Sequence, residues 1–219
     1  MLKYKKVNEL MVRIQKTSLM FRYDVCLYIN QLQKIIKMKI YNSMLLMFVS
    51  SLIFSQSIDI INPVKEIGID NWSIVNDNVM GGISSSDLYI TDENNLMFFG
   101  NVSLKNNGGF ASSRLGFGKG KLKNIKAFQI RFKGDGKKYK FRLRESYRSS
   151  NYSIDFDTKS GIWTNIEILV SDLNPMFMGY YSRNAKKLEI ENISSLGFQI
   201  SDKQDGEFKL EIMHVKAIY

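Results

Sequence analysis

The side chains best suited to binding or acid–base chemistry fall in one alternating stretch of the sequence. Arg142 and Arg144 are two residues apart, as are Asp155 and Asp157, and Trp163 follows. Alternate residues of a strand share one face, so each pair projects from one side of a sheet. Arginines there could bind an anion or hydroxyl groups beside the stacking surface of Trp163. Cross-strand ion pairs on a solvated face would explain the same pattern.

The sequence offers little for a catalytic or metal centre. Asp155 and Asp157 would stand roughly 6–7 Å apart, which could suit glycoside hydrolysis, but the nearby arginines explain them as ion-pair partners. The chain has one histidine, His214, and one cysteine, Cys26. A Ser-His-Asp arrangement would have to use His214, and a zinc site needs more ligands of these types. We therefore predict no catalytic residue, no metal and no cofactor.

Two motifs with paired glycines, at 72–84 and 99–114, are the most distinctive features of the chain. Paired glycines permit sharp turns, and nearby Asn and Asp side chains can cap the amides around them. Neither motif has the spacing of a phosphate-binding loop. The candidate binding residues in the two motifs are Trp72, Asn76, Asp77, Asn107 and Arg114.

Arg114 is of special interest because alternation places it on the same face as Phe110. If Phe110 is buried, Arg114 points inward or into the edge of a cleft and needs a carboxylate, since a buried unpaired charge is costly. We expect Asp77 to be that partner. The pair could be purely structural or could contact a ligand.

From residue 58 onward the sequence alternates with period two, and Gly, Asn and Asp occupy the breaks. Turns are expected at Gly134-Asp135-Gly136 and Asn106-Asn107-Gly108-Gly109, each closing a hairpin, and at Asp205-Gly206. Many short strands without a helical period predict an all-β antiparallel sandwich or barrel in a single domain, 58–219. The expected strands are 87–91, 96–104, 128–133, 139–144, 152–158, 162–170, 195–201 and 208–212.

The alternation also predicts which side chains face the core. The inward set includes Phe128, Ile130, Phe132, Tyr139, Phe141 and Leu143. The outward set of the same strands is basic: Arg131, Lys133, Lys138, Lys140, Arg142 and Arg144. If the strands that follow are neighbours, one polar face would combine Arg142, Arg144, Asp155, Asp157, Glu167 and Trp163.

The net charge of +10 comes mainly from residues 1–57, where nine basic and two acidic residues give +7. The positive charge therefore does not indicate a nucleic-acid-binding surface on the folded domain, and we predict no nucleic-acid partner. Residues 38–57 resemble a signal peptide, with Lys39 before an apolar run at 44–54 and small residues after it. That run is too short for a comfortable membrane span. An uncleaved anchor and a transit peptide are the alternatives.

The motifs together resemble the complex I intermediate-associated protein 30 family. The resemblance covers about Ile67 to Ile218 and rests on the two glycine motifs and on Gly134-Asp135-Gly136, Tyr139, Trp163, Pro175-Met176-Phe177-Met178-Gly179, Gly197-Phe198, Asp202, Gln204, Gly206 and Phe208. It implies a jelly-roll β-sandwich similar to galactose-binding domains. It also implies a chaperone-like assembly factor that holds membrane-arm intermediates of respiratory complex I.

We therefore expect a non-enzymatic module that binds a protein partner. The alternative is an exported carbohydrate-binding jelly roll that uses Trp163. Use of the signal peptide would place the protein in the periplasm, in the cell envelope or outside the cell, with no stable membrane span in the mature chain. The alternative location is the mitochondrion.

Overall fold

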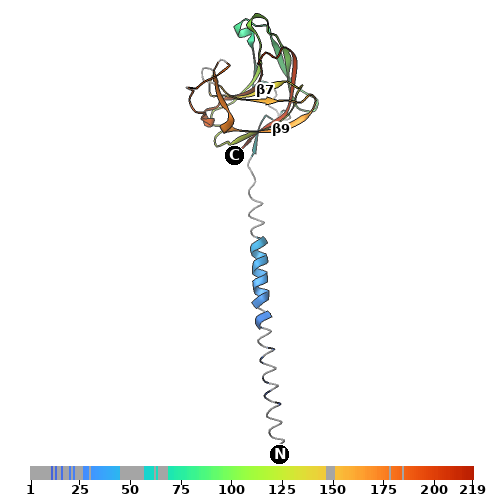
Figure 1. The fold of residues 1–219 in the computed structure, drawn as a ribbon, viewed down its shortest axis with the longest axis vertical. Coiled ribbons are helices and arrows are strands. Elements are labelled where there is room, and N and C mark those ends of the chain that lie inside the picture. Colours follow the sequence, from blue (N-terminus) through green and yellow to red (C-terminus); the bar gives the residue numbers. More distant parts are fainter. Residues whose placement is uncertain are drawn as a thin grey trace, which may run out of the picture. The chain divides into compact units, whose positions relative to one another are not determined.

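The computed structural model describes residues 57–61, 63, 69–146, 151–177, 179–183 and 185–219, together with 27–29, 31–44 and residues 11, 13, 16, 20 and 22. The chain divides into two units, Met1–Phe54 and Ser55–Tyr219 (Figure 1). In the first unit, residues 31–44 are helical and their side chains are exposed. Among the described residues no helix combines the length and the apolar character needed to cross a membrane. Apart from Met44, the predicted signal-peptide core at 44–54 lies outside the described residues.

The second unit consists of strands and short 3-10 helices. The strands are β1 (Ser57–Ile61), β2 (Trp72–Asn76), β3 (Ser85–Ile90), β4 (Leu96–Val102), β5 (Ala111–Gly116), β6 (Ala127–Lys133), β7 (Lys138–Arg144), β8 (Asn151–Asp157), β9 (Trp163–Leu169), β10 (Asn174–Phe177), β11 (Tyr180–Tyr181), β12 (Ser195–Ile200) and β13 (Gly206–Ile218). The 3-10 helices are η1 (Asp77–Met80), η2 (Lys105–Asn107), η3 (Val170–Asp172) and η4 (Ile190–Asn192).

The strands form two antiparallel sheets. Sheet A has the order β3-β4-β13-β6-β9, with β1 also paired to β13, and sheet B has the order β11-β10-β8-β7-β12-β5-β2. Strands β7 and β9, labelled in Figure 1, therefore belong to different sheets. The prediction of an all-β antiparallel fold is confirmed.

The core lies between the inner faces of the two sheets. Aromatic rings of sheet A contact rings of sheet B there, with centroid distances of 5.1 Å for Phe128 and Phe141 and 4.8 Å for Phe132 and Phe156. Each predicted inward residue of β6 and β7 is fully buried. The predicted faces are confirmed for these strands, because period-two alternation is a local property of the chain.

The predicted hairpins are wrong. β6 and β7 follow each other in the chain but lie in sheet A and sheet B respectively, and the same holds for β4 and β5. The turn at Gly134-Asp135-Gly136 therefore crosses between the sheets. Asp135 stabilises the crossing, since its Oδ2 accepts hydrogen bonds from the Tyr139 hydroxyl of sheet B at 3.1 Å and the Lys209 amide of sheet A at 3.0 Å.

The predicted single polar face is also wrong, because β8 belongs to sheet B and β9 to sheet A. Arg142, Arg144 and Asp155 lie on the outer face of sheet B, whereas Trp163 lies on the outer face of sheet A. The sequence-based argument assumed that consecutive strands pair, and in this fold these two do not.

Candidate functional site

The two glycine motifs meet at one buried carboxylate, that of Asp77, which begins η1 and is fully buried. Its Oδ1 accepts the Ser84 amide at 2.9 Å, and its Oδ2 accepts the Gly109 amide at 2.6 Å and the Phe110 amide at 3.3 Å. The Ser84 hydroxyl also donates to Oδ2. We call Asp77 with these donors the Asp77 knot. It ties the first motif to the second at the point where the chain passes between the sheets.

Glycines of both motifs are required around this carboxylate. A Cβ on Gly82 would overlap the Asp77 side chain, and one on Gly108 would lie 2.7 Å from Asp77 Oδ2 and 2.5 Å from the Ser103 carbonyl oxygen. Burial raises the pKa of Asp77, but the hydrogen bonds from Ser84, Gly109 and Phe110 outweigh it, so this pKa lies below its ordinary value of 3.8. The Asp77 carboxylate is therefore ionised and structural, because both of its oxygens already accept hydrogen bonds from the protein.

The predicted pair of Arg114 and Asp77 is wrong. Strand β5 begins at Ala111, and its inward residues are Ala111, Ser113 and Leu115, which are buried. Arg114 consequently projects from the opposite, outer face of sheet B. The alternation from Phe110 to Arg114 holds, but Phe110 is only half-buried, so the condition on which the inward placement of Arg114 depended is not met.

The structure places the other candidates near the knot in the following surroundings. The Asn76 side-chain oxygen accepts a hydrogen bond from the Ser86 hydroxyl at 2.7 Å. Trp72 is half-buried and packs against the core. Asn107 lies in η2 with φ of 60°, which an asparagine tolerates better than most residues.

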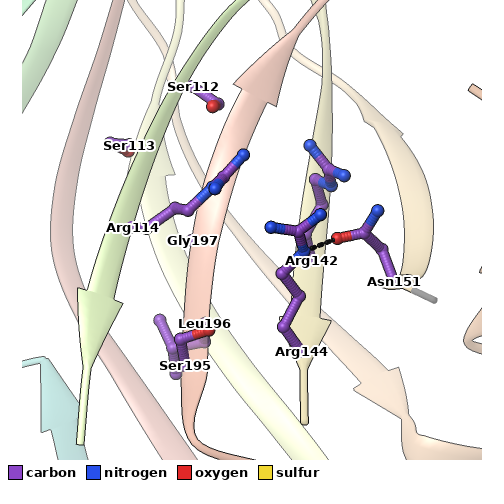
Figure 2. Close-up of a pocket in the computed structure, with 9 residues that line it drawn as sticks. All are labelled: Ser112, Ser113, Arg114, Arg142, Arg144, Asn151, Ser195, Leu196 and Gly197. Atoms are coloured by element: carbon purple, nitrogen blue, oxygen red, sulfur yellow. Dashed lines mark hydrogen bonds between the residues drawn. The ribbon is translucent and has the colours of Figure 1, made fainter. Parts of the chain in front are cut away.

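Arg114, Arg142 and Arg144, in contrast, are brought together on the outer face of sheet B. Arg114 of β5 and Arg142 of β7 are both in register with Gly197 of β12, the strand between them. Figure 2 shows Arg114 reaching from β5 over β12, and Arg142 and Arg144 lying along the neighbouring strand β7. They line a small pocket together with Ser112, Ser113, Asn151, Ser195, Leu196 and Gly197. We call this group the arginine pocket.

Gly197 makes the convergence possible. A Cβ at this position would overlap the backbone carbonyl of Ser113 on β5, so a side chain there would force the strands apart. Glycine inside a strand commonly marks such a close approach. With no side chain on β12 at this position, Arg114 can extend across the strand toward β7 (Figure 2).

Neutral amides orient two of the guanidinium groups. Arg142 Nη1 donates to the side-chain oxygen of Gln199, and Arg144 Nε donates to that of Asn151, the dashed contact in Figure 2. Burial lowers the pKa of Arg142, and the charges of Arg114 and Arg144 lower it further, to about 9. Arg142 thus remains protonated at pH 7 while like charges surround it.

Lys140 lies two residues before Arg142 on β7 and has a different environment. Its Nζ lies 2.8 Å from Asp155 Oδ1 and 2.7 Å from Asp202 Oδ2, so two carboxylates compensate its charge. The ion-pair interpretation of this face therefore holds for Lys140 and Asp155, with a weaker contact of 4.0 Å between Lys138 and Asp157. It does not describe Arg142, whose electrostatic neighbours are cations.

Trp163 lies apart from the arginine pocket, at the edge of sheet A. Lys133 Nζ is 4.9 Å from its ring centroid, and the Arg131 guanidinium carbon is 5.9 Å away. Cations within about 6 Å of an indole ring are attracted to it. Lys133 is also paired with the buried Glu211 at 2.6 Å. Trp163 thus takes part in a structural network of its own sheet.

A family model described as complex I intermediate-associated protein 30 matches residues 62–212. The chain belongs to the complex I intermediate-associated protein 30 family. This confirms the resemblance seen in the sequence. The matched range includes both glycine motifs, which meet at the Asp77 knot.

Two curated relatives carry the name "Probable complex I intermediate-associated protein 30, mitochondrial", one from Caenorhabditis elegans and one from Caenorhabditis briggsae. Each is 26% identical in an alignment of 169 residues that covers 67% of this chain and 50% of the relative. The chain spans about half the length of the curated relatives it matches.

Solved structures with the same fold include the family 11 carbohydrate-binding module of a Clostridium thermocellum cellulase, with a TM-score of 0.58 and 15% identity over 75% of this chain and 95% of that module. A second structure of that module holds a β-1,3-1,4-mixed-linked tetrasaccharide and gives a TM-score of 0.57 at 15% identity, over 75% of this chain and 96% of that one. At this identity the likeness establishes the fold alone. The predicted galactose-binding-like jelly-roll sandwich is confirmed.

Sequence reasoning named the three arginines but missed the residues that organise them. Gln199 and Asn151 orient Arg142 and Arg144, and Gly197 opens the space between the strands. The available signal was Gly197 itself, a glycine within a predicted strand and flanked by apolar residues.

Proposed function

We propose that this protein is a non-enzymatic, assembly-factor-like module that binds a protein partner through the outer face of sheet B. Membership of the complex I intermediate-associated protein 30 family supports the assembly role. The observation that carries the choice of face is the arginine pocket, where three cationic side chains from β5 and β7 line one pocket with Gly197.

The chemistry of this face suits recognition. Lys140 is compensated by two carboxylates, whereas the charges acting on Arg142 are those of Arg114 and Arg144. Arginine is also enriched at the energetic centres of protein interfaces.

The proposed partner is a protein of a respiratory complex I assembly intermediate, as the family name suggests. The test is capture of isolated intermediates by the immobilised full chain and by Arg114→Gln and Arg142→Gln. Lys209→Gln is the matched control, because it removes one exposed positive charge from the outer face of sheet A. We expect the two arginine variants to lose capture and Lys209→Gln to retain it. Equal capture by all four proteins would reject the proposed face, and no capture by the unaltered chain would reject the proposed partner.

Carbohydrate binding is the second candidate, and one feature of the same face favours it. Arg144 is in register with Asn151, Asn151 with Met176 of β10, and Met176 with Tyr181 of β11. Tyr181 is 59% exposed, so this row places an open aromatic ring and hydrogen-bond donors on one surface. Sugars bind to such combinations of aromatic rings and polar groups. The neighbour that holds a tetrasaccharide has the same fold.

A glycan array distinguishes the two candidates. Saturable glycan binding that is lost in Tyr181→Ala and retained in Trp163→Ala would support the carbohydrate candidate on sheet B. If glycan binding is lost only in Trp163→Ala, the sugar site lies on sheet A, which contradicts the proposed site on sheet B. Capture of the complex I intermediate with no glycan binding would support the assembly role.

The two candidate functions imply different locations of the protein. The curated relatives are named mitochondrial, which favours the mitochondrial alternative for an assembly role. Carbohydrate binding, in contrast, is consistent with export of the protein, directed by the segment 38–57. Fractionation of the native cells with an antibody against the chain separates these locations.

A further inference from the structure

Sheet A ends in a strand that has one unpaired edge. Among the described strands, β9 is paired with β6 alone, and the register of this pair contains no bulge. Thr164 and Ile166 of β9 face the inner side of the sheet but remain half-buried, as expected at an edge that no other described strand covers. Every second residue of β9 therefore directs its N–H and C=O groups away from the sheet.

The other edges of the two sheets are shorter or have a neighbour. Sheet B ends in the two-residue β11 and in the five-residue β2. At the opposite end of sheet A, β3 lies beside β2, because the Ser86 hydroxyl donates to the Asn76 side-chain oxygen at 2.7 Å. Edge strands are commonly protected from pairing by Pro, Lys, a bulge or a short length. The seven residues of β9 include neither Pro nor Lys, so β9 is the edge best suited to accept another strand.

The sequence of β9 is complementary to itself. In an antiparallel pair, residues that direct their hydrogen-bonding groups toward the partner lie opposite one another, so a two-fold axis relating two copies of β9 must pass through a residue. An axis at Ile166 is the one that pairs the whole strand. It places Asn165 opposite Glu167 of the second copy and Trp163 opposite Leu169, all on the outer face. An axis at Glu167 would instead oppose two carboxylates.

The same register covers exposed apolar side chains at the two ends of the strand. Leu169 is 44% exposed, and Ile162, which directly precedes β9, is 53% exposed. Leu169 meets the Trp163 ring of the second copy, and one further step of pairing sets Ile162 opposite Val170. The axis repeats each contact. Cross-strand pairs of aromatic and β-branched side chains stabilise a sheet.

We propose that β9 is a homodimer interface, at which two copies of this chain join their A sheets antiparallel about a two-fold axis at Ile166. The interface consists of the backbone ladder, the repeated pair of Asn165 and Glu167, and the apolar pairs at the ends. The arginine pocket belongs to the other sheet, so the dimer would carry two such pockets. The inference does not rest on the proposed function.

The first test is sedimentation equilibrium of the full chain, for which we expect a reversible monomer–dimer equilibrium. Asn165→Glu sets like charges opposite each other at two symmetric positions and should weaken dimerisation at least about threefold, whereas Asn165→Lys should strengthen it by a similar factor. The double variant Asn165→Glu/Glu167→Lys restores opposite charges and should recover the affinity. Asn101→Glu is the matched control, because Asn101 is exposed on β4 of the same sheet, and should change the affinity by less than about twofold.

A purely structural effect of these substitutions would run in the opposite direction. Arg131 of β6 is in register with Asn165 within one chain, so Asn165→Glu gains a cationic neighbour and Asn165→Lys gains a like charge. In melting curves at low protein concentration, Asn165→Glu should therefore be at least as stable as Asn165→Lys. Weaker dimerisation of Asn165→Glu then reports the contact between copies and not a loss of folding.

Disulfide crosslinking tests the register itself. In a Cys26→Ser background, an equimolar mixture of Asn165→Cys and Glu167→Cys chains should form a crosslinked dimer, because opposite residues of an antiparallel pair have Cα atoms about 4.5–5.5 Å apart. Either chain alone places its cysteines on diagonal positions roughly 7–8 Å apart, which is too far for a disulfide.

Three results would overturn the proposal. They are a chain that stays monomeric at every concentration, a dimer whose affinity does not respond to the charge at position 165, and crosslinking of either chain alone that equals that of the mixture. Hydrogen exchange distinguishes a different occupant of the edge. If the amides of β9 in a monomeric chain gain protection only when a complex I intermediate is added, the edge receives a strand of that partner, and the interface between copies is rejected.

Discussion

Replacing Asp77 with Asn is expected to destabilise the strand unit strongly. The best orientation of the amide keeps its oxygen at the Oδ2 position, where the amides of Gly109 and Phe110 and the Ser84 hydroxyl donate. Its NH2 group then faces the Ser84 amide, so one hydrogen bond to a charged acceptor, about 1.5–3 kcal/mol, is lost. The remaining bonds weaken because their acceptor becomes neutral.

Together these losses amount to roughly 3 kcal/mol, which for a unit of this size lowers Tm by about 6–12 °C. The assay is thermal and urea unfolding followed by circular dichroism. Asp92→Asn is the matched control, because Asp92 lies exposed in a turn. If Asp77→Asn melts within about 1 °C of Asp92→Asn, the Asp77 knot is not the stabilising corner inferred here.

Three further predictions concern the same structure. Gly108→Ala should cost about 1–3 kcal/mol in urea unfolding, because its Cβ would contact Asp77 Oδ2 and the Ser103 carbonyl, whereas Gly116→Ala, with ordinary contacts, should cost less than about 1 kcal/mol. Similar costs for both would contradict the packing around Asp77. The difference in unfolding free energy between the unaltered chain and Asp77→Asn should be fully present above pH 3.8, because the pKa of Asp77 is lowered in the folded state. This difference should shrink as the pH falls through the lowered pKa. A difference that stays constant down to the acid transition would refute an ionised Asp77. Lys140→Gln should change the unfolding free energy by at most about 1 kcal/mol, because Asp155 and Asp202 are half-exposed, and a larger loss would show that this ion-pair network is essential to the fold.

The sequence was sufficient to predict the strands and their faces. The buried set on β6 and β7, from Phe128 to Leu143, follows directly from alternation, which each strand displays without reference to its neighbours. The pairing of the strands was not predictable in the same way. A glycine turn such as Gly134-Asp135-Gly136 serves a hairpin and a crossing between sheets equally well, and the contacts of Asp135 to both sheets decide which one forms.

The candidate site was predictable only in part. Arg142 and Arg144 share a face because they are two residues apart on one strand. Arg114 joins them only through β12, from a position about 30 residues earlier in the chain, and the assumption that Phe110 is buried placed it on the wrong face. Asp77 was named as a candidate binding residue and as the partner of Arg114, and capping of amides was expected only of Asn and Asp side chains in general; its donors from 84 and 109–110 become visible only when both motifs are folded together.

The most direct test of the central claim, that the outer face of sheet B is the binding face, is site-specific photocrosslinking. A photoreactive residue replaces Ser195 in the arginine pocket or, as the control, the exposed Glu207 on sheet A. With isolated complex I assembly intermediates, the account predicts a crosslinked partner from position 195 and none from position 207. Crosslinks from position 207 alone would contradict it.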